Sequence, residues 1–419
     1  MHKNPKPIIS KKRSVFKRIY RWLYHFYFVY LFKRDTILAT ISVFLFIWLL
    51  SLIPVNTSIL NPFKTALKDL DFNDISYSVL KKNESNPIDK RIVIVNIGSA
   101  DRGGLALLIE KIRAAEPTVI GLDVTFDGAR ETEKDSLLRQ MIVSTSNLVV
   151  VSKINWQNKN EPEDIGYFGE YTHNRGYSNF IAEDGGTIRI FSSSEQINNK
   201  KSLSFPSAIM ARADSNAYAE LLERKNEYEF INYTRNQDQY MIVDGIDLLS
   251  GNATDLLFKG KIVLLGYISS GPYDIEDKHF TPLNTRFAGK SVPDMNGIVI
   301  HANILSMILD RNYIHYVPGT IYWFLTILIA WLHVALFMRY YIEQHIWFHL
   351  VAKLAQIFFS ILSVYFGILC FDWFNLILDT KSSLIIIILA VDIIYFYEAF
   401  AVWLHQKFGF QTNFHSKSH

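Results

Sequence analysis

Four long apolar runs constrain the fold of this chain more than any other feature of its sequence. The first, residues 36–53, carries no charge, and as a helix rising about 1.5 Å per residue it nearly spans the hydrocarbon core of a bilayer. Three similar runs come later, at residues 319–338, 347–370 and 382–404. The sequence therefore predicts one transmembrane helix before a long middle segment and a three-helix transmembrane bundle after it.

The basic residues before the first run predict how these helices are oriented. They are Lys3, Lys6, Lys11, Lys12, Arg13, Lys17, Arg18, Arg21, Lys33 and Arg34. The positive-inside rule places this N-terminal segment in the cytoplasm, and four spans then return the C-terminus to the same side. Aromatic residues alternate with these cations over residues 15–32, which suits a helix lying on the lipids of the inner interface, whereas residues 1–13 fit a solvated tail better.

We therefore expect a multi-pass protein of the inner (cytoplasmic) membrane with its large middle domain in the periplasmic or extracellular space. The first run lacks a small-residue cleavage site before Pro54, so it is expected to be an uncleaved signal anchor. The expected organisation is a basic cytoplasmic or interfacial segment (1–35), a transmembrane helix (36–53), an extracytoplasmic domain (54–318), the three-helix bundle (319–404) and a short cytoplasmic tail (405–419).

Composition excludes several other classes of protein. Hydrophobic residues make up 49% of the 419-residue chain, and their excess lies in the four apolar runs, while the middle has ordinary globular composition. A formal net charge of +3 gives no basic patch of the kind that binds nucleic acid. The single cysteine, Cys370, excludes an intramolecular disulfide and a multi-cysteine metal site, and no cofactor is expected.

The middle segment alternates short β-branched runs with helical ones. Residues 91–98, 118–126 and 147–154 read as buried strands, and residues 105–117 and 135–144 read as the helices between them. A later strand is predicted at residues 259–268 and a helix at 297–310, while residues 155–245 are polar and give no clear assignment. This pattern predicts an α/β domain with a mostly parallel sheet flanked by helices.

Ligands of open α/β sheets bind beyond the carboxyl ends of the strands, and polar side chains are expected there. The candidate ligand rim is Asn96, Asp123, Asp127, Ser269, Ser270, Gly271 and Asp274. Two structural roles stay open: Asp123 could cap a turn or helix start, and residues 269–274 could form a tight turn. Neither a phosphate loop nor a dinucleotide fingerprint is present.

Ionisable residues in the predicted bundle form a second candidate site, because charges inside a bilayer usually face protein or water. Helical spacing puts His333, Lys353 and Glu398 at a similar depth near the cytoplasmic ends of their spans, with Asp392 nearer mid-membrane and within reach of Lys353. This candidate intramembrane polar layer could be a static pair, a contact for a partner protein, or an ion pathway. The alternative is that Lys353 and Glu398 extend to the interface.

The middle segment resembles a known family, the second type of CHASE domain, an extracellular sensory module of bacterial receptors. The resemblance covers about residues 54–404 and is carried by motifs in a fixed order: RIVIVNIG, PTVIGLDVTFDG followed by Asp135 and Leu138, GYSNFIAEDGGTIRI, SFPSAIMA, INY, KGKIVLLG, FTPLN and GIVIHANIL. The arrangement of one helix before the domain and three after it is similar too. Asn96 departs from the pattern, since many members have Asp near the end of the first strand.

The resemblance implies sensing of an extracytoplasmic signal, with no defined ligand residues to carry over. Receptors of this type usually continue into a kinase, cyclase or other output domain, whereas here only residues 405–419 follow the last predicted span. We therefore expect a non-enzymatic sensory subunit that passes a conformational change through its helices to a separate protein. The expected partners are membrane lipids and a protein at the helices or the extracytoplasmic domain, with a homodimer left open.

Two other functions compete with this expectation. One is a structural or docking subunit of a multiprotein envelope complex. The other is a metal-assisted extracytoplasmic hydrolase using Asp123, Asp127, Asp274 and His301, whose oxygen and imidazole groups suit a divalent metal. The wide sequence spacing of these four residues weighs against the hydrolase.

Overall fold

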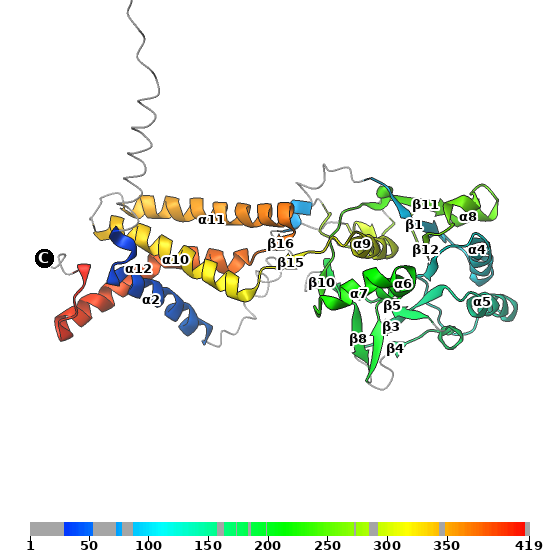
Figure 1. Cartoon of the computed structure of the whole chain (residues 1–419), viewed down its shortest axis with the longest axis horizontal. Coiled ribbons are helices and arrows are strands. Elements are labelled where there is room, and N and C mark those ends of the chain that lie inside the picture. The colour runs from blue at the N-terminus through cyan, green and yellow to red at the C-terminus, as the bar shows by residue number, and fades with distance from the viewer. Residues whose placement is uncertain are drawn as a thin grey trace, which may run out of the picture. The chain divides into compact units, whose positions relative to one another are not determined.

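The computed structural model describes residues 29–52, 73–77, 87–156, 163–172, 174–182, 186–197, 199–271, 274–284, 292–342 and 348–414 (Figure 1). The chain divides into two compact units. One comprises Leu60–His315, and the other comprises Met1–Ile59 with Tyr316–His419. Several predictions fall outside the described residues. They concern the basic residues from Lys3 to Arg21, most of the interfacial helix expected at residues 15–32, and Pro54.

The first unit is built on a seven-stranded sheet, which confirms the predicted α/β fold with a mostly parallel sheet. The order is β11-β1-β12-β2-β3-β4, with β5 also paired to β3, and only β4 is antiparallel to its neighbour. These strands are β1 (Asp89–Asn96), β2 (Val119–Leu122), β3 (Leu148–Ile154), β4 (Glu163–Asp164), β5 (Arg175–Tyr177), β11 (Tyr240–Asp244) and β12 (Ile262–Gly266).

The central strand comes from late in the sequence. β12 pairs in parallel with β1 through Ile92↔Ile262 and with β2 through Ile262↔Val119, so it separates two strands that are consecutive in the local β-α-β pattern. Every residue of β2 and β12 is buried, which fits their unbroken apolar sequences. The carboxyl ends of β1, β12 and β2 consequently meet at one edge of the sheet.

Helices cover both faces of this sheet. On one face α4 (Arg102–Ala114), α5 (Thr132–Ser144) and α8 (Gly245–Leu249) enclose a core that includes Val95 and Leu265. On the other face lie α6 (Phe205–Ala213) and α9 (Gly297–Asp310), with α7 (Ser215–Glu223) packed against both. A Cβ added to Gly121 in β2 would come within 2.7 Å of Ile209 in α6, so the helix packs directly on the strand.

The region that resisted assignment from sequence holds short strands and part of the main sheet. It supplies β4, β5 and β11, together with a separate sheet of order β10-β7-β6 and a hairpin of β8 and β9. The remaining short elements of this unit are η4 (Gly169–Tyr171), β6 (Ile181–Ala182), β7 (Ile188–Phe191), β8 (Ser194–Ile197), β9 (Lys200–Leu203), β10 (Glu229–Phe230), η5 (Gln237–Gln239), η6 (Asp255–Leu257), β13 (Lys278–His279) and β14 (Met295–Asn296).

Among its described residues, the second unit contains four helices that are long and apolar enough to cross a membrane, as the sequence predicts. They are α2 (Arg34–Ser51), α10 (Gly319–Ile342), α11 (Phe348–Phe374) and α12 (Thr380–Phe408). β15 (His315–Tyr316) precedes α10, and β16 (Leu376–Ile377) connects α11 to α12. α12 contacts the other three helices, and its Ala390 and Ile394 share a buried core with Val43 of α2 and Val334 of α10.

α12 extends beyond the predicted end of its span at residue 404. It stops at Gly409, whose positive φ of 68° is the left-handed conformation that favours glycine at a helix C-terminus. The backbone N–H of Gly409 donates to the carbonyl of His405 at 2.9 Å. The chain then returns toward the start of α2, where Phe414 is buried.

Candidate functional site

Asn96, the first candidate at the rim of the sheet, ties three strands together. Its Nδ2 donates to Asp244 Oδ1 at 3.0 Å, and its Oδ1 accepts from the backbone N–H groups of Gly98 at 3.1 Å and Ile268 at 3.0 Å. An aspartate here would place a second carboxylate against Asp244 and lose the donor. The departure from the family pattern at this position therefore has a local structural reason.

The loop that begins at Ser269 is held by its own hydrogen bonds. Asn296 Oδ1 accepts from Ser269 Oγ at 3.0 Å, and Asp274 Oδ2 accepts from Tyr267 Oη at 2.6 Å and from the Ser270 backbone N–H at 3.0 Å. The Gly271 carbonyl accepts from Lys278 Nζ at 2.9 Å. Pro272 and Tyr273 lie outside the described residues. The polar groups of the described residues on either side of this gap are therefore engaged in structural hydrogen bonds.

Asp127 lies on the exposed side of this edge. Its side chain is exposed, and its backbone carbonyl accepts from Arg102 Nη2 at 3.3 Å. The same guanidinium forms a buried ion pair with Asp135, with Nη1 and Oδ1 separated by 2.7 Å. Asp127 therefore contributes its backbone to the support of the rim, while its carboxylate faces solvent.

Asp123 and His301 form the buried part of the rim. Asp123 follows β2, its backbone N–H donates to the Leu265 carbonyl at 2.8 Å, and its side chain is 17% exposed. His301, on α9, is 3% exposed, and its Nε2 lies 4.0 Å from Asp123 Oδ2. The imidazole stacks on Phe180 with ring centroids 4.7 Å apart and meets Phe205 edge-on at 5.1 Å.

Burial governs the charge state of this pair. Desolvation raises the pKa of Asp123 to about 7, the negative charge of Asp277 adds to the rise, and Lys153 opposes it. Burial, with a smaller contribution from His279, lowers the pKa of His301 to about 3. His301 Nδ1 has no hydrogen-bond partner within the part of the chain that the structure describes. Between roughly pH 3 and pH 7 the pair is therefore an uncharged carboxyl group beside an uncharged imidazole.

Asp277 and His279 extend the rim and were missed in the sequence. His279 Nε2 lies 3.7 Å from Asp277 Oδ1, and Asp277 Oδ2 accepts from the Gly297 backbone N–H at 3.2 Å, at the start of α9. The His279 ring meets Phe180 edge-on at 5.0 Å. The available signal was the close Asp-x-His spacing of two polar residues just after the loop at residues 269–274.

The metal-binding set considered for a hydrolase does not assemble. Within the described residues no three His, Cys, Asp or Glu side chains are arranged to hold a metal ion. Asp123 and His301 lie together, whereas Asp127 faces solvent and Asp274 is bonded within its own loop. The chemistry available to Asp123 and His301 is the binding of a polar group beside an aromatic ring.

The candidate polar layer of the helical unit separates into three places. Lys353 Nζ on α11 lies 3.3 Å from Asp392 Oδ1 on α12. The Tyr341 hydroxyl on α10 donates to Glu398 Oε2 on α12. His333 is 6% exposed and packs against Phe337 and Phe359 at ring centroid distances of 5.5 and 4.6 Å.

Asp35 is a polar centre that sequence reasoning missed. It lies in the first turn of α2, is 1% exposed, and accepts from Tyr397 Oη at 2.8 Å, Thr412 Oγ1 at 3.1 Å and the Asn413 backbone N–H at 2.7 Å. These bonds join α2, α12 and the C-terminal tail. The sequence offered only an isolated acid at the edge of a basic segment, with its partners more than 360 positions away.

Comparison with known proteins identifies the family. A protein-family model described as the CHASE2 domain matches residues 44–338, which is more than half of the chain. No curated protein and no solved structure matches. CHASE2 domains are extracellular sensory domains, and the match includes the whole α/β unit with residues of α2 and α10. The resemblance expected from the motifs is confirmed, and the chain belongs to the CHASE2 domain family.

Proposed function

We propose that this protein is a membrane-anchored sensory subunit that binds its signal at the rim formed by Asp123, Phe180, Asp277, His279 and His301. In this proposal binding changes the packing of the rim, and the membrane helices pass that change to a separate protein. The observation that carries the proposal is the buried Asp123–His301 pair, because its polar atoms are only partly satisfied.

The physical reason concerns the cost of burying polar groups. A buried donor or acceptor without a partner costs about 1–3 kcal/mol, so such groups persist where something else compensates for them. A signal molecule that supplies a hydrogen-bond partner to Asp123 or His301 would recover part of this cost. The pair also lies beyond the carboxyl ends of parallel strands, where open α/β sheets bind their ligands.

The polar pair of the helical unit supports the idea of a separate partner. The side chains of Lys353 and Asp392 are 61% and 47% exposed at the surface of the four-helix unit. Charges within a bilayer usually face protein or water, because contact with lipid is costly. A partner protein covering α11 and α12 would provide such an environment.

The binding proposal is tested with the full-length protein in lipid nanodiscs. Fractions of growth medium and cell-envelope extract are screened by hydrogen exchange for protection of β2 and α9. A genuine signal should protect these peptides in the wild type and in Asp127→Asn, whose carboxylate is exposed on the same rim, but not in the double variant Asp123→Ala/His301→Phe, which removes both polar groups of the buried pair. Protection that is equal in all three proteins would place the binding site elsewhere.

The partner is tested by co-purification in mild detergent. A protein captured with the wild type and lost from the Lys353→Met/Asp392→Leu double variant would support signalling through α11 and α12. A stoichiometric partner that remains bound to this variant and to Asp123→Asn would instead favour the docking-subunit alternative.

A further inference from the structure

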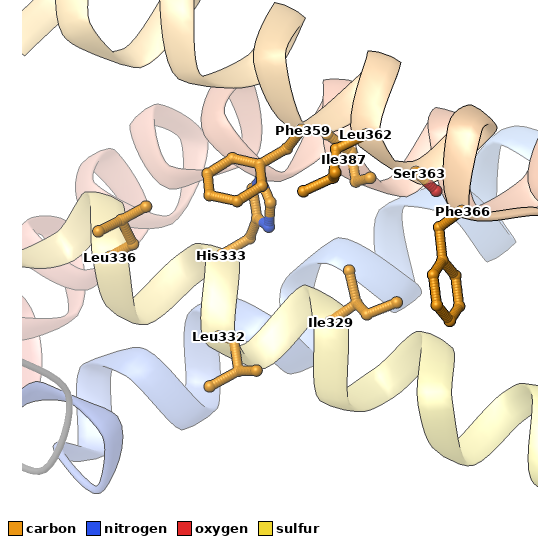
Figure 2. A pocket seen from close by; sticks show the side chains of 9 residues that line it. All are labelled: Ile329, Leu332, His333, Leu336, Phe359, Leu362, Ser363, Phe366 and Ile387. Carbon is orange, nitrogen blue, oxygen red and sulfur yellow. The ribbon is translucent and has the colours of Figure 1, made fainter. Parts of the chain in front are cut away.

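A cavity of about 360 Å³ lies within the helical unit, between α10, α11 and α12 (Figure 2). Ile329 and His333 reach it from α10, Phe359, Ser363 and Phe366 from α11, and Ile387 from α12. Figure 2 shows the His333 side chain rising from α10 toward Phe359. All three helices belong to the segments that can cross a membrane, so the cavity lies at bilayer depth.

His333 brings an unsatisfied acceptor to this cavity. The backbone carbonyl of Ile329, one turn earlier in α10, lies close to the imidazole ring and favours a proton on the nitrogen that faces it. The other ring nitrogen, Nε2, is buried and has no partner in the part of the chain that the structure describes. A neutral imidazole that donates through one nitrogen carries a lone pair on the other, so Nε2 is an acceptor. An occupant with a hydrogen-bond donor would satisfy it.

The rest of the lining excludes charged occupants. Its side chains are aliphatic or aromatic apart from His333 and the hydroxyl of Ser363, and no Lys, Arg, Asp or Glu among the described residues lines the cavity. An ionic headgroup brought here would have no counter-charge and would lose its hydration at high cost. The favoured occupant is therefore neutral and apolar over most of its surface.

The cavity is half-open, so its volume limits the part of an occupant that it can enclose. At about 30 Å³ for each water-sized atom, 360 Å³ accommodates roughly a dozen non-hydrogen atoms. We propose that this cavity binds a neutral, mostly aliphatic alcohol of about that size, with its hydroxyl group donating to His333 Nε2. This site is independent of the extracytoplasmic rim and adds a lipid-soluble ligand to the signals that the protein can receive.

The proposal is tested first on the wild-type protein in nanodiscs, with a diazirine derivative of 1-decanol as the probe. Peptide mapping should find the label on α10 and α11 around the cavity. Unlabelled 1-decanol should compete about fivefold better than decyl methyl ether at equal mole fraction in the bilayer, because only the alcohol can donate a hydrogen bond. Equal competition by the two compounds would show an acyl-chain pocket without hydroxyl recognition and would overturn the proposal.

Variants then identify the acceptor. His333→Phe keeps an aromatic ring and removes Nε2, so the preference for alcohol over ether should disappear. Ser363→Ala is the matched control, since it removes the other polar group of the lining, and it should retain the preference. A preference that survives His333→Phe and is lost in Ser363→Ala would assign recognition to the serine and contradict the proposal.

Discussion

Replacing Asp123 with asparagine keeps the shape of the side chain and removes its titration. The carboxyl group follows β2, is 17% exposed, and lies 4.0 Å from His301 Nε2. Its pKa is raised to about 7 from the usual 3.8, chiefly by burial and then by Asp277. The difference in stability between the wild type and Asp123→Asn therefore measures the cost of ionising Asp123 at the rim.

Proton binding determines whether the stability contributed by Asp123 rises or falls with pH. Between pH 3.8 and 7 the folded protein holds a proton on Asp123 that the unfolded chain has released, so the stability contributed by this group falls as pH rises. At about 1.36 kcal/mol per pKa unit, the contribution of Asp123 to the free energy of unfolding changes by about 4 kcal/mol across this pH range. The amide in Asp123→Asn cannot titrate, so the stability of the variant relative to wild type should increase through this window and level off above pH 7.

The stability contributed by His301 depends on pH in the opposite direction. Its pKa is lowered from 6.5 to about 3, so its contribution to stability is lost as pH falls below 6.5. From about pH 4 to 6.5 the contributions of Asp123 and His301 nearly cancel in the wild type. In Asp123→Asn only the His301 dependence remains, and the stability contributed by this site should rise steeply with pH.

Hydrogen exchange measured by mass spectrometry on full-length protein in nanodiscs gives the opening free energy of the amides in β2 and β12. After correction for intrinsic exchange, the ratio of protection factors between Asp123→Asn and wild type should rise about 50-fold from pH 5 to 7, and Asp127→Asn should show no such change. A ratio that stays constant from pH 5 to 8 would mean that Asp123 has an ordinary pKa and would refute the reasoning.

Three further predictions concern packing and the helical unit. Gly121→Ala should destabilise the α/β unit by about 1–3 kcal/mol in the same exchange assay, because the added Cβ would meet Ile209 at 2.7 Å. Asp35→Ala should release the C-terminal tail, seen as faster limited proteolysis after α12, and unchanged cleavage would contradict the observed bonding. Lys353→Met and Asp392→Leu should each lower the melting temperature in nanodiscs more than the double variant does, whereas additive losses would show that the pair is not coupled.

Much of the fold could be predicted because its central strands are unbroken apolar runs. β1, β2, β3 and β12 were each expected from such runs, and the spans from their length and lack of charge. β11 could not be assigned, because an edge strand is half-buried and depends on its neighbour β1 for pairing. The position of β12 between β1 and β2 likewise depends on long-range contacts.

The rim was only partly predictable for the same reason. Asp123 follows a recognisable buried strand, so its place at the sheet edge could be expected from the sequence. Asp277 and His279 come from a loop and a two-residue strand, and their approach to the rim depends on pairing with β14. Asp35 was overlooked because its partners, Tyr397 and Asn413, are supplied by the far end of the chain.

The proposal that the rim controls the membrane helices can be tested without knowing the signal, because protonation of Asp123 can be imposed through pH. In a Cys370→Ser background, spin labels at Leu350 on α11 and Phe408 on α12, both exposed, report the distance between these helices by double electron–electron resonance. The distance distribution should differ between pH 6 and pH 8 in the wild type and stay at its pH 6 form in Asp123→Asn. Identical distributions in the wild type at both pH values, or a shift that persists in the variant, would contradict coupling between the rim and the helices.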